Sequence, residues 1–260
     1  MAVVNGDEAG VPEGAQSRPI SSIVIITAVQ SQALPLAEKF QLVEDAALSA
    51  EGFPWVRYSG VYKNLCLNVI WLGKDLALGV DSVGTVSAAL VAYASIQALK
   101  PDLIINAGTA GGLKSKGATI GDVFLPSHVA FHDRRNPLPV CDLYCIGTRQ
   151  AFSTPDLLKE LNLKAGKLST GNSLDICPQD EKLITANDAA VKDMEGAAIA
   201  YVADLLKIPI IFIKAVSYIV HDEKPDSDNY LKNLMGGSVA LDEAVVRAIE
   251  FTNGKRLSEL

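Results

Sequence analysis

The most constraining feature of this chain is the alternation of short, continuously apolar runs with segments of helical periodicity. Residues 22–27, 102–106 and 209–216 are rich in isoleucine and valine, which predicts buried strands. Residues 31–40 and 85–99 carry apolar or small side chains at helical spacing. Strands that are apolar on both faces and alternate with helices predict an α/β domain with a mostly parallel sheet, covered by helices on both sides.

Shorter patterns predict the remaining elements. Residues 56–62 and 65–71 form two strand-like runs around a Lys63-Asn64 turn, and residues 195–207 predict a helix of small side chains. Residues 239–253 predict an amphipathic closing helix that ends at Gly254. Further strands are expected at residues 76–80, 121–125 and 129–131. Because no repeat or internal linker divides the chain, we expect a disordered tail at residues 1–18 and a single domain at residues 19–260.

Composition excludes several classes of function. The chain has 260 residues, 23 basic and 30 acidic, with a net charge of −7. A general nucleic-acid binder needs a basic surface, so no nucleic-acid partner is expected. The apolar runs are much shorter than the roughly 20 residues that span a bilayer, and the polar N-terminus lacks a secretion signal. We therefore expect a cytoplasmic protein without a membrane partner. The four cysteines lack zinc-site spacing, and no metal or cofactor is expected.

The strand ends indicate where a ligand binds. In open α/β sheets, ligands lie at the carboxyl ends of the strands, here the loops after Val29, Asn106 and Val216. The glycines of residues 108–112 follow a predicted strand and allow backbone N–H groups to approach a ligand closely. Their spacing matches neither a dinucleotide nor a P-loop motif. A ligand-binding turn and a plain tight turn both remain open.

Five motifs occur along the chain in a fixed order. They are VDSVGT (80–85), INAGTAGG (105–112), FHDRR (131–135), LSTG (168–171) and KDMEGAA (192–198). Together they resemble the plant-type branch of the 5′-methylthioadenosine/S-adenosylhomocysteine nucleosidases, and the resemblance covers nearly all of Pro19 to Leu260. It implies the nucleoside phosphorylase fold, a three-layer α/β/α domain with a mixed, mostly parallel sheet, and a homodimer whose active site borders the partner subunit.

The resemblance also implies roles for particular residues. In the family, water attacks an N-glycosidic bond. A Glu on the first loop activates that water, an Asp after a late strand protonates the adenine, and a Glu that follows Met holds the ribose hydroxyls. The Met-Glu pair matches Met194 and Glu195 here, and Thr109 and Gly111 are retained. We predict substrate-binding roles for these residues, for Asn172 and for His132, although His132 also suits a purely structural role.

The chain departs from the family at the positions of its acids. Gln32 stands where the first-loop Glu is expected, and Tyr218 and His221 stand where the family has two Asp residues. Asn172 replaces a fourth carboxylate. An amide does not accept a proton at neutral pH, and a phenol with a pKa near 10 is a poor general acid. Losing a general acid or base costs about 10²–10⁴ in rate.

These departures lead to three functional hypotheses. The first is an enzyme that has lost methylthioadenosine hydrolysis and acts as a cyclase or isomerase, with Tyr218, His221 and Gln32 as catalytic residues. Its substrate would be a small uncharged metabolite of plant specialised metabolism, such as an oxo-terpenoid or iridoid precursor. The second is an inactive ligand-binding or storage protein, in which Tyr218 fills the purine space. The third is a methylthioadenosine nucleosidase of methionine salvage with residual activity.

Overall fold

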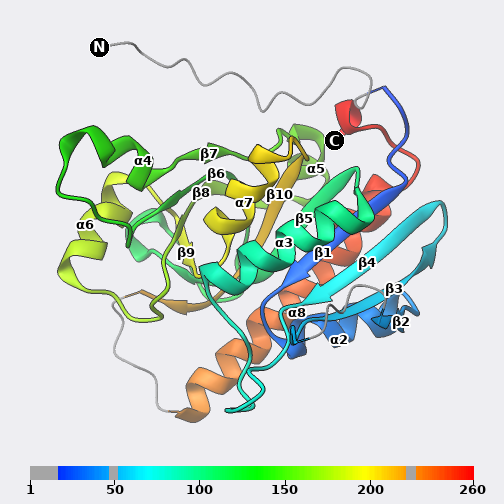
Figure 1. Ribbon diagram of the computed structural model, residues 1–260, viewed down its shortest axis with the longest axis horizontal. Helices are drawn as coiled ribbons and strands as arrows, with labels where there is room; N and C mark the ends of the chain where they lie inside the picture. Colours follow the sequence, from blue (N-terminus) through cyan, green and yellow to red (C-terminus); the bar gives the residue numbers. More distant parts are fainter. Residues whose placement is uncertain (1–16, 47–51, 221–226) are drawn as a thin grey trace.

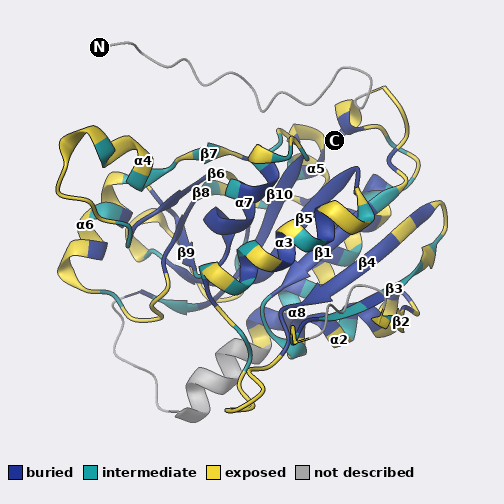
Figure 2. Cartoon of the chain, in the orientation of Figure 1, coloured by how far each residue is buried: buried dark blue, intermediate teal, exposed yellow. Residues whose placement is uncertain are grey.

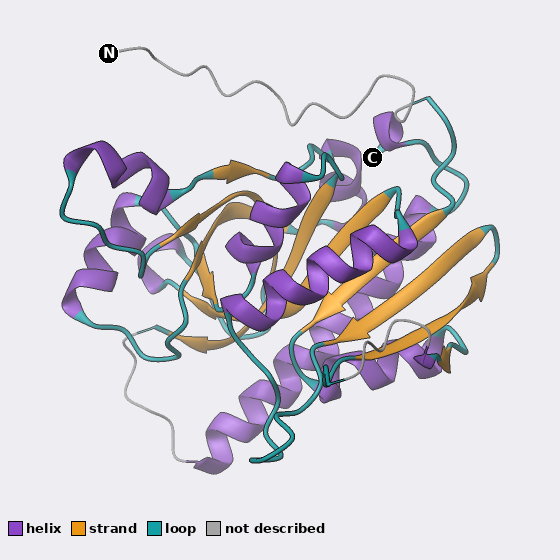
Figure 3. Cartoon of the chain, in the orientation of Figure 1, coloured by secondary structure: helices purple, strands orange, loops and turns teal. Residues whose placement is uncertain are grey.

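The structure is a computed structural model that describes residues 17–46, 52–220 and 227–260, with side chains in the last range described from residue 236 (Figure 1). Figure 3 shows which parts of the chain are helix, strand and loop. The strands are β1 (Ser22–Thr27), β2 (Val43–Glu44), β3 (Val56–Tyr62), β4 (Leu65–Trp71), β5 (Leu103–Gly112), β6 (Val123–Phe131), β7 (Arg149–Gln150), β8 (Lys164–Thr170), β9 (Val191–Asp193) and β10 (Ile210–Ile219). The helices are α2 (Gln30–Lys39), α3 (Thr85–Leu99), α4 (Asp142–Ile146), α5 (Pro155–Leu161), α6 (Pro178–Ala186), α7 (Gly196–Leu205) and α8 (Ser227–Thr252), with short 3-10 helices η2 (Lys114–Lys116), η3 (Pro139–Cys141) and η4 (Leu257–Glu259).

The predicted three-layer α/β/α architecture is confirmed. A ten-stranded mixed sheet runs in the order β10-β6-β8-β9-β5-β1-β4-β3-β2, with β7 paired to β6. Helices α3 and α7 pack together on one face, and α2, α5 and α8 cover the other (Figure 1). Each face has its own apolar core, and the central strands β1, β5 and β10 between them are mostly buried (Figure 2). Burial on both faces explains why the central strands are continuously apolar.

Half of the sheet closes on itself. Strand β5 pairs with β9 on one side and with β10 on the other, and β10 pairs in turn with β6. Because β6, β8 and β9 are also paired in series, these five strands form a closed ring. Strands β1, β5 and β10 run parallel, so their carboxyl ends meet at one edge of the sheet. That edge is where the sequence places the ligand site.

The prediction of a strand at residues 76–80 is wrong. Residues 76–78 form a turn, in which the Asp75 carboxylate accepts hydrogen bonds from the N–H groups of Ala77 and Leu78. Leu76 and Leu78 are 82% and 77% exposed. These apolar side chains therefore lie on the surface and do not mark a buried strand. The Asp75 carboxylate stabilises the turn locally.

The prediction of a loop or turn after Asn106 is also wrong. Strand β5 continues through the glycines to Gly112, because β10 lies alongside and pairs with it up to Ile219. The two strands predicted at residues 121–125 and 129–131 are a single strand, β6, with a register irregularity near Pro126. In both cases pairing with a distant strand overrides the local signal from glycine or proline.

Other differences concern the ends of the chain and its short elements. The pattern at residues 239–253 marks only the later part of α8, and α4, α5, α6, β8 and β9 were not predicted. Residues 1–16 of the expected tail lie outside the described residues, whereas Arg18 bonds to the Asp102 carboxylate ahead of β5. None of the helices in the described part of the chain has the length and apolar character needed to cross a bilayer.

Candidate functional site

Glu195 lies between β9 and α7, at the centre of the candidate site. Its side chain is buried, and its Oε1 accepts a hydrogen bond of 2.9 Å from the backbone N–H of Gly84. Gly84 precedes the first turn of α3 and has a φ of 101°, which L side chains adopt only with strain. The glycine thus allows the backbone to turn its N–H toward the carboxylate.

A buried ion pair supports this position. Lys214 of β10 lies 2.9 Å from Asp193 of β9, and both side chains are 1% exposed. Asp193 also accepts hydrogen bonds from the Gly196 N–H at 2.9 Å and the Thr170 hydroxyl at 2.6 Å. A buried pair is tolerated better when further hydrogen bonds satisfy its polar atoms, and Asp193 has two such bonds beside the ion pair. One carboxylate therefore connects β8, β9, β10 and the start of α7.

This environment changes the proton affinity of Glu195. Burial and the neighbouring Asp193 carboxylate raise the pKa of Glu195 to about 7, against the opposing effects of Lys214 and of two backbone N–H groups. A carboxyl group in this range accepts or donates a proton near neutral pH.

Gln32 lies in the first turn of α2 rather than on a loop. It is 2% exposed, and its Nε2 donates a 3.2 Å hydrogen bond to the Thr109 hydroxyl of β5. Its Oε1 has no hydrogen-bond partner among the described residues. A Cβ placed on Gly108 would lie 3.7 Å from this oxygen and 3.4 Å from Lys214 Nζ. The fold therefore brings Gln32, Thr109 and Lys214 to the same stretch of β5.

Tyr218 lies beside Gly111, where β10 has a bulge between Val216 and Tyr218. The half-buried ring contacts Gly111 so closely that a Cβ there would lie 2.5 Å from the tyrosine Cζ. The ring therefore occupies the space that glycine leaves open at the end of β5. His221, the other residue predicted at this strand end, lies outside the described residues, and its role stays a prediction.

His132 is buried at the end of β6. Its Nδ1 lies 3.1 Å from the Ser169 hydroxyl, which accepts a hydrogen bond from the Asn187 amide. The serine proton is therefore available to Nδ1, which suits a neutral imidazole. Burial and the nearby Lys192 ammonium lower the pKa of His132 accordingly. A Cβ on Gly171 would lie 2.2 Å from His132 Nε2, so the ring is tightly enclosed.

Asn172 organises the start of α3. Its Oδ1 accepts hydrogen bonds from the Thr85 N–H at 2.9 Å and the Thr85 hydroxyl at 2.8 Å. Its own N–H and Nδ2 donate to Asp133. Met194 is half-buried next to Glu195. The predicted substrate contacts of Asn172, Met194, Thr109, Gly111 and His132 stay predictions.

Sequence reasoning missed Asp193, Lys214 and Gly84. The signal for Lys214 was present, because a lysine inside the apolar run of residues 209–216 must find a buried acceptor. Within the described ranges, no group of three or more His, Cys, Asp or Glu side chains has a metal-binding arrangement.

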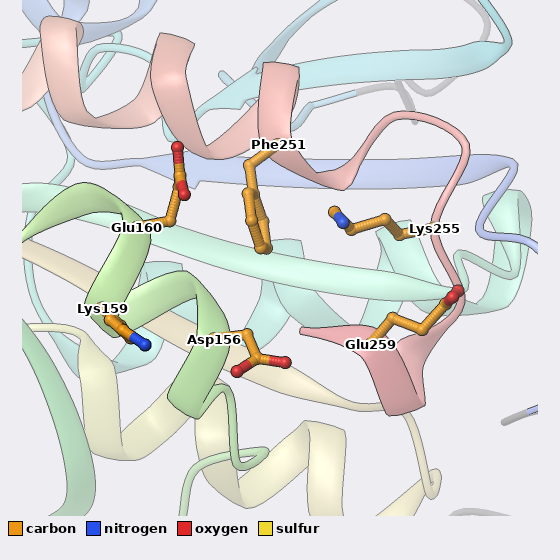
Figure 4. A pocket seen from close by; sticks show the side chains of 6 residues that line it. All are labelled: Asp156, Lys159, Glu160, Phe251, Lys255 and Glu259. Carbon is orange, nitrogen blue, oxygen red and sulfur yellow. The ribbon is translucent and has the colours of Figure 1, made fainter.

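A surface pocket lies away from these residues, at the opposite edge of the sheet (Figure 4). This surface pocket of about 410 Å³ lies between α5, the end of α8 and η4. Lys255, in its wall, accepts a backbone hydrogen bond from Ile20, which immediately precedes β1, so the pocket faces the amino ends of the strands. It contains none of the predicted site residues. Its lining residues are Asp156, Lys159, Glu160, Phe251, Lys255 and Glu259.

Comparison with known proteins places the chain in a family. Residues 22–250 match the family model of the phosphorylase superfamily. The chain is 61% identical to the 5′-methylthioadenosine nucleosidase of Arabidopsis thaliana, over 94% of this chain and 91% of that protein. It is 55% identical to the 5′-methylthioadenosine/S-adenosylhomocysteine nucleosidase of the same plant, over 96% and 99%. This chain belongs to the 5′-methylthioadenosine/S-adenosylhomocysteine nucleosidase family.

The solved structures agree with this assignment. The apo structure of the Arabidopsis thaliana 5′-methylthioadenosine nucleosidase superposes with a TM-score of 0.90, covering 94% of this chain and all of that one. The expectation of a cyclase or isomerase acting on a terpenoid or iridoid precursor is wrong. High identity to nucleosidases along almost the whole chain overturns this expectation, which rested on a few replaced acids.

The first prediction concerns the contact between Gly171 and His132. Gly171→Ala places a methyl group against a buried, hydrogen-bonded ring, and we expect a loss of about 1–3 kcal/mol in the free energy of unfolding. Urea denaturation measures this loss. Gly236→Ala is the matched control, because nothing lies within 4 Å of its added Cβ. Equal stability of the two variants would contradict the tight packing of His132.

The second prediction concerns the pH dependence of stability. Between about pH 4.3, where an unfolded Glu ionises, and pH 7, the folded protein retains a proton on Glu195 that the unfolded chain releases. The contribution of this residue to stability therefore falls as the pH rises through that window. Glu195→Gln removes the titration, so its Tm relative to the unmodified protein is expected to increase from pH 5 to pH 8. Glu38→Gln makes the same substitution at an exposed position of α2 and is the matched control. A flat difference for Glu195→Gln would refute the raised pKa.

Proposed function

We propose that this protein hydrolyses the N-glycosidic bond of 5′-methylthioadenosine or of a closely related 5′-thio nucleoside. The observation that carries the proposal is the buried Glu195, held by the Gly84 N–H and the Lys214–Asp193 pair where the strands end. The substrate class comes from the relatives, which are named as nucleosidases of 5′-methylthioadenosine and S-adenosylhomocysteine. A buried carboxylate is well suited to accept hydrogen bonds from two ribose hydroxyls.

In the proposed reaction, the oxygen of a water molecule bonds to ribose C1′ while the bond from C1′ to adenine breaks. Adenine takes the electron pair, one water proton ends on adenine, and the other stays on the new ribose hydroxyl. Gln32 Oε1 is a buried acceptor without a partner among the described residues. It orients the water molecule by accepting a hydrogen bond from one of its O–H groups. The Tyr218 hydroxyl, beside Gly111, is the proposed donor to the departing base.

This assignment implies a slow enzyme. An amide orients a water molecule but does not remove its proton, and a phenol is a weaker acid than a carboxyl group. Each missing acid or base is worth about 10²–10⁴ in rate. The residual rate then depends on binding, orientation and the electrostatics of the buried site.

The third prediction is that restoring a base accelerates the reaction. We expect the unmodified protein to release adenine from 5′-methylthioadenosine slowly, and Gln32→Glu to raise kcat by about 10²–10⁴. Combining it with Tyr218→Asp is expected to raise the rate further. Chromatography of released adenine provides the measurement, and Gln97→Glu on the exposed face of α3 is the matched control.

Two outcomes of that experiment would reject the proposal. The first is an unmodified protein that releases no adenine above the enzyme-free rate. If calorimetry then detected 5′-methylthioadenosine binding, the chain would be a ligand-binding protein instead. The second is a Gln32→Glu variant that folds normally but is no faster than the Gln97→Glu control, which would mean that position 32 does not contact the water.

We also propose that the protein is a homodimer. Exposed apolar side chains occur in the turn at residues 76–78 and on the outer face of α3, where Val86, Leu90 and Tyr93 follow one another at helical spacing. Exposed apolar patches of this kind are typical of protein interfaces. This patch adjoins Gly84, so a partner bound there would border the Glu195 site.

The fourth prediction tests this association. We expect the unmodified protein to elute with the mass of a dimer in size-exclusion chromatography with light scattering, and Val86→Asp to elute as a monomer because it buries a charge at the interface. Val43→Asp on β2 changes another exposed valine and is expected to leave the dimer intact. A monomeric unmodified protein, or a dimeric Val86→Asp variant, would contradict the proposed interface.

A further inference from the structure

Lys192 is a buried cation outside the chemistry proposed above. It lies in β9 between β8 and β5, paired in register with Ser169 and Gly111, and its side chain is fully buried. Its Nζ donates hydrogen bonds to three consecutive backbone carbonyls, at 3.0, 2.7 and 3.2 Å. These carbonyls belong to Ser173, Leu174 and Asp175.

Because Lys192 is charged, breaking its three hydrogen bonds would cost considerable free energy. In contrast to Lys214, Lys192 forms no ion pair with a carboxylate of the described residues, and an ammonium group has three N–H donors, all of which the loop uses. Burial lowers the pKa of Lys192, while the more distant carboxylates of Asp175, Asp180, Asp193 and Asp133 favour its charged form. A buried cation that lost these carbonyls would be left unsatisfied, which is costly.

The loop held by Lys192 is connected to Glu195 through a short series of hydrogen bonds and neighbouring residues. Asn172, the residue before Ser173, accepts hydrogen bonds from Thr85 at the start of α3. The residue before Thr85 is Gly84, whose N–H bonds to Glu195. If residues 173–175 moved, we would therefore expect Asn172 and the start of α3 to move with them. The Gly84 N–H, which bonds to the Glu195 carboxylate, would then shift as well.

We propose that Lys192 is a positioning residue for the ligand site. Its ammonium holds residues 173–175 in place and, through Asn172, fixes the first turn of α3 and the Gly84 N–H that bonds to Glu195. The kinetic part of this proposal rests on the nucleosidase function proposed above, whereas its structural part does not. Lys192 makes no contact with the reacting atoms in this role, so it acts on ligand binding rather than on bond cleavage.

Amide hydrogen exchange tests the structural part without any substrate. We expect Lys192→Met to accelerate exchange of the Gly84, Thr85 and Asn172 amides by about tenfold or more, since each is now hydrogen-bonded. Lys192→Arg keeps a cation and is expected to restore most of the protection. Lys167→Met, in neighbouring β8, removes a half-exposed lysine and serves as the matched control.

Steady-state kinetics of adenine release from 5′-methylthioadenosine tests the functional part. We expect KM to rise by about tenfold in Lys192→Met, with kcat within about threefold, and Lys192→Arg to recover most of the loss. If Lys192→Met does not fold, Lys192→Gln carries the same predictions with smaller effects. Unchanged exchange at the three amides, or a fall in kcat with an unchanged KM, would overturn the proposal. If the unmodified protein released no adenine, the exchange result would still decide the role of Lys192.

Discussion

The structure around the candidate site depends on one buried carboxylate, that of Asp193. It accepts hydrogen bonds from Thr170 and Gly196 and pairs with Lys214, so it joins three strands of the closed ring to the helix that follows it. Removing either charge of the pair would leave the other buried without a partner, a loss of about 3–5 kcal/mol in comparable sites. Glu195 lies two residues further along the chain, and the Asp193 carboxylate helps to raise its pKa.

The fold could be predicted where burial alone determines the sequence pattern. Strands β1, β3 and β4 match their predicted ranges, because the apolar runs of β1 and β4 are buried and the turn at residues 63–64 joins β3 to β4. The failures occur where a partner distant in sequence decides the outcome. The glycines of β5 remain in a strand because β10 pairs with them, and the apolar residues at 76–80 lie on an exposed surface. A local pattern contains neither kind of information.

The candidate site was predictable to a similar extent. Gln32 and Thr109 were singled out from separate motifs, and the structure joins them by a hydrogen bond. Lys214 was missed because a single lysine in an apolar run indicates only that some acceptor exists. The two buried lysines have different partners. Lys192 donates hydrogen bonds to three backbone carbonyls, and Lys214 pairs with a carboxylate. The replaced acids were given too much weight, because a few positions bear on the rate of a reaction more than on membership of a family.

The contact between Tyr218 and Gly111 restricts how this site can change over evolutionary time. The tyrosine ring fills the space that any side chain at position 111 would occupy. Position 111 therefore accepts a larger residue only after position 218 has become smaller or its ring has moved. In the opposite direction, a ring can appear at 218 only while 111 is glycine. The order of substitutions at these two positions is thus constrained by geometry, so neither can be interpreted in a relative without reading the other.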